Sequence, residues 1–293
     1  MTRYFEYLRP KTVSEAVELK ALHGDSAKFW AGGTDMMLQW KGGVVSPDYC
    51  IDLSYLTELR YVQQDGNSLR IGALATLDDI DRNSGLGALS ATLGATARLM
   101  CTQQSRTIAT LGGNLCNGSP SADMYPTLVV MGAVVKILGP NGERTMPLDE
   151  FHTGVRKTAL ADDEILVEIV VPEIDAKSAG HYNRVARTVV DIALVSSAAF
   201  IKLGDNGVVE RAGIALGGVA PTVLRVVEAE NMLLGKTLAS IDEALIADIS
   251  QQAMSSAVAI TDIRASKEYR TEMTSVLTKR AIRHCIEELG GTE

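Results

Sequence analysis

The pattern of apolar and polar residues near the start of the chain predicts a strand, a helix and a second strand. The strands are the short runs FEYLRP, residues 5–10, and AKFWA, residues 27–31. Between them, Thr12 and Glu15 have the spacing of a capping box, in which Thr accepts from the helix N-terminus and Glu reaches back. We expect the helix that follows to end at Gly24, because glycine commonly closes helices.

Three later segments have the pattern of β-hairpins. Each places an Asp-Gly or Asn-Gly pair between two strand-like runs, at residues 65–66, 141–142 and 206–207. This pair is a strong hairpin signal when both turn positions need a positive φ.

The other apolar segments are extended at one place and helical elsewhere. EILVEIVVP, residues 164–172, is a predicted strand closed by Pro172. Helical spacing is predicted for residues 34–40, 86–100, 222–235, 240–258 and 269–290. In the last third, two strands precede these helices, an order that favours an antiparallel sheet with helices on one face.

We divide the 293 residues into three domains, 1–57, 58–176 and 177–293. The first boundary follows the strand, helix, strand unit, and the second lies in the polar stretch EIDAKSAG. A chain of this length is long enough for two or three packed cores.

Composition and charge narrow the function. Hydrophobic residues make up 46% and charged residues 22%, so the whole chain should fold. The net charge of -8 argues against nucleic acid as a partner. The start, MTRYFEYLRPKT, lacks the apolar core of a secretory signal, and no later apolar run approaches the ~18 residues that span a bilayer. We therefore expect a cytoplasmic protein without a membrane span.

The cysteines and histidines show no metal-ligand spacing. We expect the scattered cysteines to be small buried residues, and the histidines to be surface or capping residues. The cysteines are Cys50, Cys101, Cys116 and Cys285, and the histidines are His23, His152, His181 and His284. We expect no metal on this chain, so any metal chemistry would belong to another polypeptide.

Glycines cluster with small polar residues at two places, AGGTD at 31–35 and TLGGNLCNGSPSAD at 110–123. Such stretches leave backbone N–H groups uncovered and let an anion approach closely. A helix starting at Thr34 or Asp35 would add the positive end of its dipole, which suits a pyrophosphate. Asp35 itself would cap that helix or bind a hydroxyl. A single Gly-Gly can be no more than a tight turn, but two such segments favour a binding function.

Common alternatives are missing from the sequence. There is no G-x-G-x-x-G, no G-x-x-x-x-G-K-[ST] and no G-x-S-x-G, and Ser119 precedes a proline. The sequence therefore gives no support for a Rossmann site, a P-loop or a serine nucleophile.

AGGTDMM together with TLGGNLCNGSPSADMYP resembles the FAD-binding medium subunit of the molybdenum hydroxylases. That family includes xanthine dehydrogenase, carbon monoxide dehydrogenase, quinoline oxidoreductase and 4-hydroxybenzoyl-CoA reductase. The resemblance continues in RPKTVSEAVEL, IGALATLDDI, DDEILVEIVVP and ARTVVDIALVS. The cysteine-bearing inserted loop of the 4-hydroxybenzoyl-CoA reductase type is missing here.

The resemblance implies an α+β protein with the vanillyl-alcohol-oxidase (PCMH) type FAD-binding fold. Residues 1–57 and 58–176 would be two α/β subdomains that hold the flavin. Residues 177–293 would be a domain like that of the CO dehydrogenase flavoprotein, a three-stranded antiparallel sheet with a helical bundle.

The resemblance also implies a set of cofactor-binding residues. The two glycine segments together would grip the FAD pyrophosphate, Asp123 would bind the ribityl or adjoining hydroxyls, and Leu166 would contact the flavin or adenine through its backbone. Met100 occupies the place of a phenylalanine beside the isoalloxazine. The pyrophosphate contacts would be Ala31, Gly32, Gly33, Thr34, Asp35, Thr110, Gly112, Gly113 and Asn114.

Two positions near the flavin stay open at this point. Relatives carry a lysine near residue 183, where this chain has Asn183 followed by Arg184. Ile192 falls on a segment that in relatives lies near one flavin face, and we expect it to shape access to the ring.

By resemblance, this chain is the FAD-carrying electron-transfer subunit of an oxidoreductase, with no catalytic acid–base residue of its own. A large subunit would hold molybdopterin, a small subunit would hold two two-iron iron–sulfur clusters, and the whole would be a dimer of heterotrimers. Two alternatives are a flavin-free assembly subunit and a self-contained FAD oxidase of the same fold.

Overall fold

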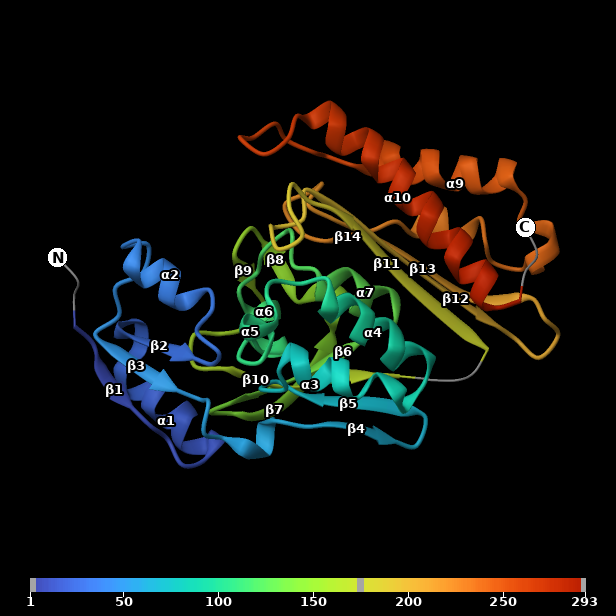
Figure 1. Cartoon of the computed structure of the whole chain (residues 1–293). Helices are drawn as coiled ribbons and strands as arrows, with labels where there is room; N and C mark the ends of the chain where they lie inside the picture. The colour runs from blue at the N-terminus through green and yellow to red at the C-terminus, as the bar shows by residue number, and fades with distance from the viewer. Residues whose placement is uncertain (1–3, 173–176, 291–293) are drawn as a thin grey trace.

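The computed structural model describes residues 4–172 and 177–290. The chain begins with a small parallel sheet of strand order β1-β3-β2, against which α1 packs (Figure 1). Its elements are β1 Glu6–Leu8, α1 Val13–His23, β2 Ala27–Trp30, α2 Met36–Lys41 and β3 Tyr49–Asp52. The predicted strand, helix, strand order is confirmed.

The capping of α1 differs slightly from the expected box. The Thr12 side chain accepts from the amide of Glu15, as predicted, and Gly24 ends the helix at φ 52°. The Glu15 carboxylate reaches back to the amide of Lys11, at 2.6 Å, rather than to that of Thr12.

The middle of the chain forms a five-stranded antiparallel sheet of order β4-β5-β10-β6-β7, with helices over one face (Figure 1). Its strands are β4 Val62–Asp65, β5 Ser68–Gly72, β6 Val134–Gly139, β7 Gly142–Pro147 and β10 Ile165–Val171. Its helices are α3 Leu77–Arg82, α4 Ala88–Arg98, α5 Gln103–Arg106, α6 Leu111–Cys116 and α7 Met124–Val130. A two-stranded hairpin, β8 His152–Gly154 with β9 Lys157–Thr158, lies beside the sheet.

The C-terminal part contains a four-stranded antiparallel sheet, where three strands were expected. The fourth strand is only two residues long and pairs with β13. The elements are β11 Ser178–Val185, β12 Val195–Leu203, β13 Val209–Gly217, β14 Leu224–Arg225, α8 Val227–Asn231, α9 Glu243–Ser256 and α10 Lys267–Glu288.

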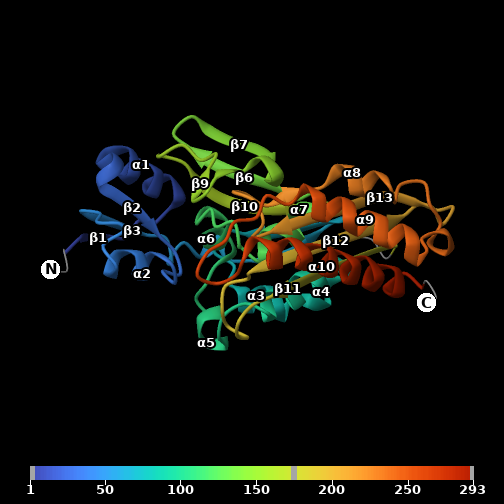
Figure 2. The same ribbon diagram turned by 90° about the horizontal axis from the view of Figure 1, so that it is seen from above.

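Helices cover both faces of this sheet, which corrects the prediction of helices on one face. Helix α10 packs on β11 and β12, and α9 packs on α10, whereas α4 and α7 of the preceding segment cover the opposite face (Figure 1). Side chains such as Tyr182 and Phe200 therefore belong to the same core as the five-stranded sheet. In Figure 2, seen from above, α9 and α10 lie over β12 and β13, and the N-terminal sheet lies at the left.

The helix expected over residues 222–235 is mostly wrong. Only Val227–Asn231 is helical, because Arg225 lies in β14 and its guanidinium pairs with the buried Glu230 carboxylate at 2.9 Å. Glu230 also accepts from the amide of Ile214 on β13. This charged contact anchors the segment to the sheet edge.

The three predicted hairpins exist, but their turn chemistry differs from the expected one. Gly66 and Gly207 have positive φ, whereas the preceding Asp65 and Asn206 do not. In each of these two turns the glycine alone adopts the left-handed conformation. In the middle hairpin Gly142 already pairs with Gly139 as the first residue of β7.

The domain boundaries predicted near 57 and 176 remain predictions. Residue 57 starts a single 3-10 turn, Thr57–Leu59, between β3 and β4. Residue 176 lies outside the described residues.

Candidate functional site

The first glycine segment touches the chain just before the second one. A Cβ at Gly32 would overlap the carbonyl oxygen of Ile108 and lie 2.7 Å from its carbonyl carbon. Ile108 is two residues before Thr110, where the second segment begins. The fold therefore brings the predicted binding segments together through backbone contact.

Three of the four glycines predicted to contact the pyrophosphate have a structural reason that lies in the protein itself. Gly32 faces the Ile108 backbone, Gly33 has φ +70° with Trp30 Nε1 only 2.5 Å from a built Cβ, and Gly112 lies against the carbonyl of Ala73. Clearance for a ligand is thus not needed to explain them.

The amides of the first segment are free of protein acceptors. Within the described chain, no hydrogen bond leaves the backbone N–H groups of Gly32, Gly33, Thr34 or Asp35. The segment lies between β2 and α2, with Asp35 at the N-cap position of α2 but making no side-chain capping bond. Consecutive free amides of this kind suit an anion.

The second segment differs from the prediction, because it is the start of helix α6 and its amides are used. Leu111 and Gly112 donate to the carbonyls of Ala75 and Ala73, at 2.9 and 2.8 Å. Gly113 donates to the Thr110 hydroxyl, at 3.1 Å. The expectation of uncovered N–H groups is therefore wrong for residues 111–113.

What the second segment offers instead is a side chain. Asn114 Oδ1 is buried and has no hydrogen-bond partner. A buried amide oxygen without a donor costs free energy, which a bound donor would recover.

A polar bridge joins α2 to α6 one turn further along. Gln39 Nε2 and Arg156 Nη1 both donate to Asn117 Oδ1, at 3.1 and 3.4 Å. Desolvation by the surrounding protein raises the pKa of Asp35, although the residue as a whole is exposed, and the nearby Arg156 guanidinium opposes this rise.

Asp123 lies in a buried network with two side chains of β11. Tyr182 Oη donates to Asp123 Oδ1 at 2.5 Å, and Arg184 Nη1 reaches both carboxylate oxygens at 3.2 and 3.3 Å. The Asp123 and Arg184 side chains are only 9% and 7% exposed. Burial raises the pKa of Asp123, and Arg184 and Tyr182 oppose this.

Successive side chains of a strand point to opposite faces, so only one of Asn183 and Arg184 can face this network. Tyr182 and Arg184 point to Asp123, whereas Asn183 and His181 lie on the opposite face and contact each other at 3.1 Å. On that face the centroid of the His181 ring lies 3.8 Å from the centroid of the His284 ring on α10. Arg184 is therefore the residue that supplies the positive charge.

Arg184 also holds two chain segments near Asp123. Its guanidinium donates to the carbonyls of Leu99, Val189 and Asp191. The first precedes Met100, and the other two lie in the loop that carries Ile192, whose side chain is exposed.

Cys101 lies beside Met100 and has an unusual backbone, with a positive φ of 37°. Burial raises the pKa of its thiol, and the positive charges of Arg106 and Arg184 oppose this rise.

Two family models match the chain. The FAD binding domain in molybdopterin dehydrogenase matches residues 3–174, and the CO dehydrogenase flavoprotein C-terminal domain matches residues 180–285. The chain belongs to the family of FAD-binding medium subunits of the molybdenum hydroxylases. The resemblance in the sequence is thereby confirmed.

Relatives of this medium-subunit family match over nearly their whole length. The carbon monoxide dehydrogenase medium chain of Hydrogenophaga pseudoflava is 33% identical, with 95% of this chain and 96% of the relative covered. The xanthine dehydrogenase FAD-binding subunit of Escherichia coli O157:H7 is also 33% identical, with 99% of each chain covered. These relatives are subunits of oxidoreductases, and this chain is an oxidoreductase subunit of the same kind.

Solved structures agree with the medium-subunit fold. Carbon monoxide dehydrogenase from Hydrogenophaga pseudoflava superposes with a TM-score of 0.93 at 32% identity, covering 98% of this chain and 99% of the other. Quinoline 2-oxidoreductase from Pseudomonas putida 86 gives 0.90 at 26% identity, covering 99% of each chain.

Two residues that the medium-subunit resemblance placed at the flavin are buried in the core. Met100 is 8% exposed, and its neighbour Leu99 is the exposed residue at 42%. Leu166 is buried at a β-bulge of β10, where α6 packs on the strand.

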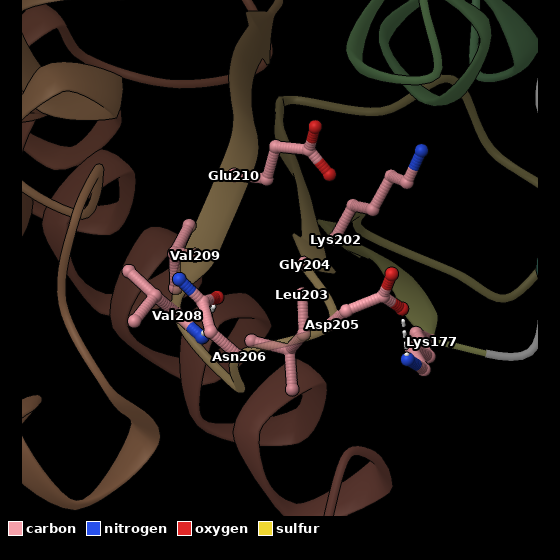
Figure 3. A pocket seen from close by; sticks show the side chains of 9 residues that line it. All are labelled: Lys177, Lys202, Leu203, Gly204, Asp205, Asn206, Val208, Val209 and Glu210. Carbon is pink, nitrogen blue, oxygen red and sulfur yellow. Dashed lines mark hydrogen bonds and ion pairs between the residues drawn. The ribbon is translucent and has the colours of Figure 1, made fainter.

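A pocket of about 610 Å³ lies at the β12–β13 hairpin (Figure 3). Both signs of charge line it, and Lys177 pairs with Asp205 at 2.6 Å. None of the predicted site residues contributes to it.

The cysteines and histidines match their predictions only in part. Cys50 and Cys285 are buried, whereas Cys116 is exposed. His152 is neither surface nor cap, because its buried ring stacks on Tyr125 and its Nε2 bonds the Leu115 carbonyl at 2.8 Å.

Residues 4–172 and 177–290 contain neither a metal-ligand cluster nor a helix that could cross a membrane. No three His, Cys, Asp or Glu side chains there gather as metal ligands would. None of the helices in these ranges has the length and apolar character needed to cross a bilayer.

Sequence reasoning did not single out Tyr182 or Arg156. Tyr182 could have been found from the strand period, because it shares a face with Arg184. The sequence around Arg156 contains no motif that indicates a binding residue, because only the folded chain brings Arg156 close to α2.

Proposed function

We propose that this chain binds FAD with the cofactor's diphosphate on the free amides of Gly32–Asp35. The observation that carries the proposal is the run of four amides without an acceptor among the described residues, next to the Gly32 contact with Ile108, which lies two residues before the second glycine segment. A diphosphate accepts several hydrogen bonds at once, so it matches such a run.

The side chains around these amides fit the same cofactor. Asn114 Oδ1 is a buried acceptor that still needs a donor, such as a hydroxyl group. The Asp123 carboxylate has about four lone-pair positions, so it can accept a ribityl hydroxyl besides Tyr182 and Arg184.

The division of labour follows from this arrangement. FAD supplies the redox chemistry when bound, and the chain binds it, orients it and sets the charge around it. The Arg184 guanidinium places one fixed positive charge beside Asp123, and no acid–base pair is required of the protein.

We infer further that this subunit passes electrons from iron–sulfur clusters on a partner to an external acceptor. The partners would be a large molybdopterin subunit and a small subunit with two two-iron clusters, assembled in the cytoplasm as a dimer of heterotrimers. Support comes from the relatives, which are named as medium chains or subunits of dehydrogenases.

Purification of the native protein tests this assembly. Two partner subunits with molybdenum and iron should copurify with the chain. A partner-free monomer that oxidises a substrate by itself would instead establish the self-contained FAD oxidase. A chain that shows no absorption near ~450 nm after FAD is added and the unbound FAD is removed would establish the flavin-free assembly subunit.

The variant Asn114→Leu tests the binding site itself. It keeps the side-chain volume but removes the amide, so we expect FAD affinity to fall about tenfold in equilibrium titrations of the stripped chain. Asn67→Leu, in the exposed β4–β5 turn, is the control and should bind like the wild type. Equal affinity of all three proteins would remove Asn114 from the site.

A further inference from the structure

The residues proposed for the diphosphate carry no positive charge of their own. The backbone of Gly32–Asp35 is neutral, and the Asp35 side chain adds a negative charge. Arg184 is already neutralised by Asp123. A cation beside these amides would add Coulomb attraction to their hydrogen bonds with a diphosphate, and a guanidinium can donate two parallel hydrogen bonds to a phosphate group.

Arg156 lies in the right place to be that cation. It sits in the β8–β9 hairpin, is exposed, and donates from Nη1 to Asn117 Oδ1. Asn117 is three residues after Asn114, so the two share one face of α6. Arg156 is also close enough to Asp35 to act on the pKa of its carboxyl, yet the two form no ion pair.

The backbone at Arg156 is held in an unusual conformation. Its φ is +56°. Within the described residues, Arg156 and Cys101 are the only non-glycine residues with a positive φ. Its amide donates to the Gly118 carbonyl at 2.8 Å, and a Cβ at Gly118 would lie 3.0 Å from Arg156 Cα. Such strain costs free energy and gathers at ligand-binding positions.

We propose that Arg156 is a cofactor-binding residue whose guanidinium donates to the diphosphate of the dinucleotide held at Gly32–Asp35. The inference rests on the proposed function, because it takes FAD as the ligand. Its long 3.4 Å bond to Asn117 leaves most of the five guanidinium donors available, and the strained backbone fixes the direction of the side chain.

The test compares FAD affinity of the stripped full-length chain in Arg156→Gly, Arg156→Lys and wild type. Glycine tolerates positive φ, so Arg156→Gly removes the side chain while relieving strain, and a folding defect is not expected. We expect its Kd for FAD to rise about tenfold, with Arg156→Lys in between. Lys157→Ala, the same loss of charge one residue further on, should change Kd less than about twofold.

Salt dependence separates a direct charge contact from a structural role. Salt screens an interaction between exposed charges, so Kd of the wild type should rise more steeply with salt than that of Arg156→Gly. A weaker but equally salt-dependent variant would show that Arg156 only positions the hairpin, and an unchanged Kd would show no role; either result overturns the inference. If the wild type itself fails to bind FAD, the proposed function falls instead.

Discussion

Asp123 depends on two side chains of β11 for its buried position. Removing Arg184 would leave a carboxylate without its cation, a change that costs about 3 kcal/mol or more in buried pairs. We expect Arg184→Met to lower the free energy of unfolding by about that amount in urea titrations. Asp123→Asn combined with Arg184→Met should cost less than the sum of the two single changes.

The exposed pair of Arg98 and Asp81 provides the matched control. The Arg98 side chain is 52% exposed, so Arg98→Met should cost less than about 1 kcal/mol. If Arg98→Met and Arg184→Met cost the same, or if the two substitutions at the buried pair are additive, the pair does not stabilise the fold as described.

His152 is the residue whose protonation should matter for stability. Burial lowers its pKa from the ordinary value of 6.5, and the bond to the Leu115 carbonyl only partly opposes this. The unfolded chain therefore takes up the proton first, so the native state loses stability as the pH falls below about 6.5. Above that pH the residue is neutral in both states and contributes no pH dependence.

The variant His152→Gln isolates this contribution. Between pH 7 and 5 the wild type should lose about 1 kcal/mol more unfolding free energy than the variant, measured by urea titration at each pH. Both proteins keep the other titrating groups, so the difference reports His152. Parallel curves for the two proteins would contradict the assignment.

At the scale of elements, the contact between the 31–35 loop and the segment before α6 assembles the site. Gly32→Ala would place a methyl group on the Ile108 carbonyl, and the two segments would have to separate. We expect loss of bound flavin and a destabilisation of about 2 kcal/mol, read from the absorption spectrum and from thermal melting.

Gly85→Ala is the control for this change. Gly85 has open space around a built Cβ and no positive φ, so alanine should be neutral there. Retention of flavin in Gly32→Ala would mean that the two segments do not need this contact. Gly33→Val cannot serve as a test, because φ +70° and Trp30 forbid it regardless of any ligand.

Sequence reasoning succeeded where the signal is local. The Thr12 cap, the strands and the positions of the three hairpins depend on neighbours within a few residues. It failed where distant contacts decide. Residues 111–113 contain a Gly-Gly pair typical of a loop, but the carbonyls of Ala73 and Ala75 take their amides and a helix forms.

On the scale of the whole molecule, the C-terminal sheet is shared between two cores. Tyr182 and Phe200 pack with the five-stranded sheet, whereas Val195 and Ile214 pack with α9 and α10. The topology of the whole chain decides which helices pack on each face of a sheet. The local pattern of apolar and polar residues does not contain this information. The family resemblance supplied the cofactor and partners, but not this shared packing or Arg156.

The alternation along β11 separates two sets of positions that could be redesigned independently. Residues 182 and 184 face Asp123, and residues 181 and 183 face α10. Substitutions in the first set would alter the surroundings of Asp123, and those in the second would alter the attachment of the last helix. Since the two sets share no side-chain partner, a combinatorial library at these four positions could be optimised one face at a time.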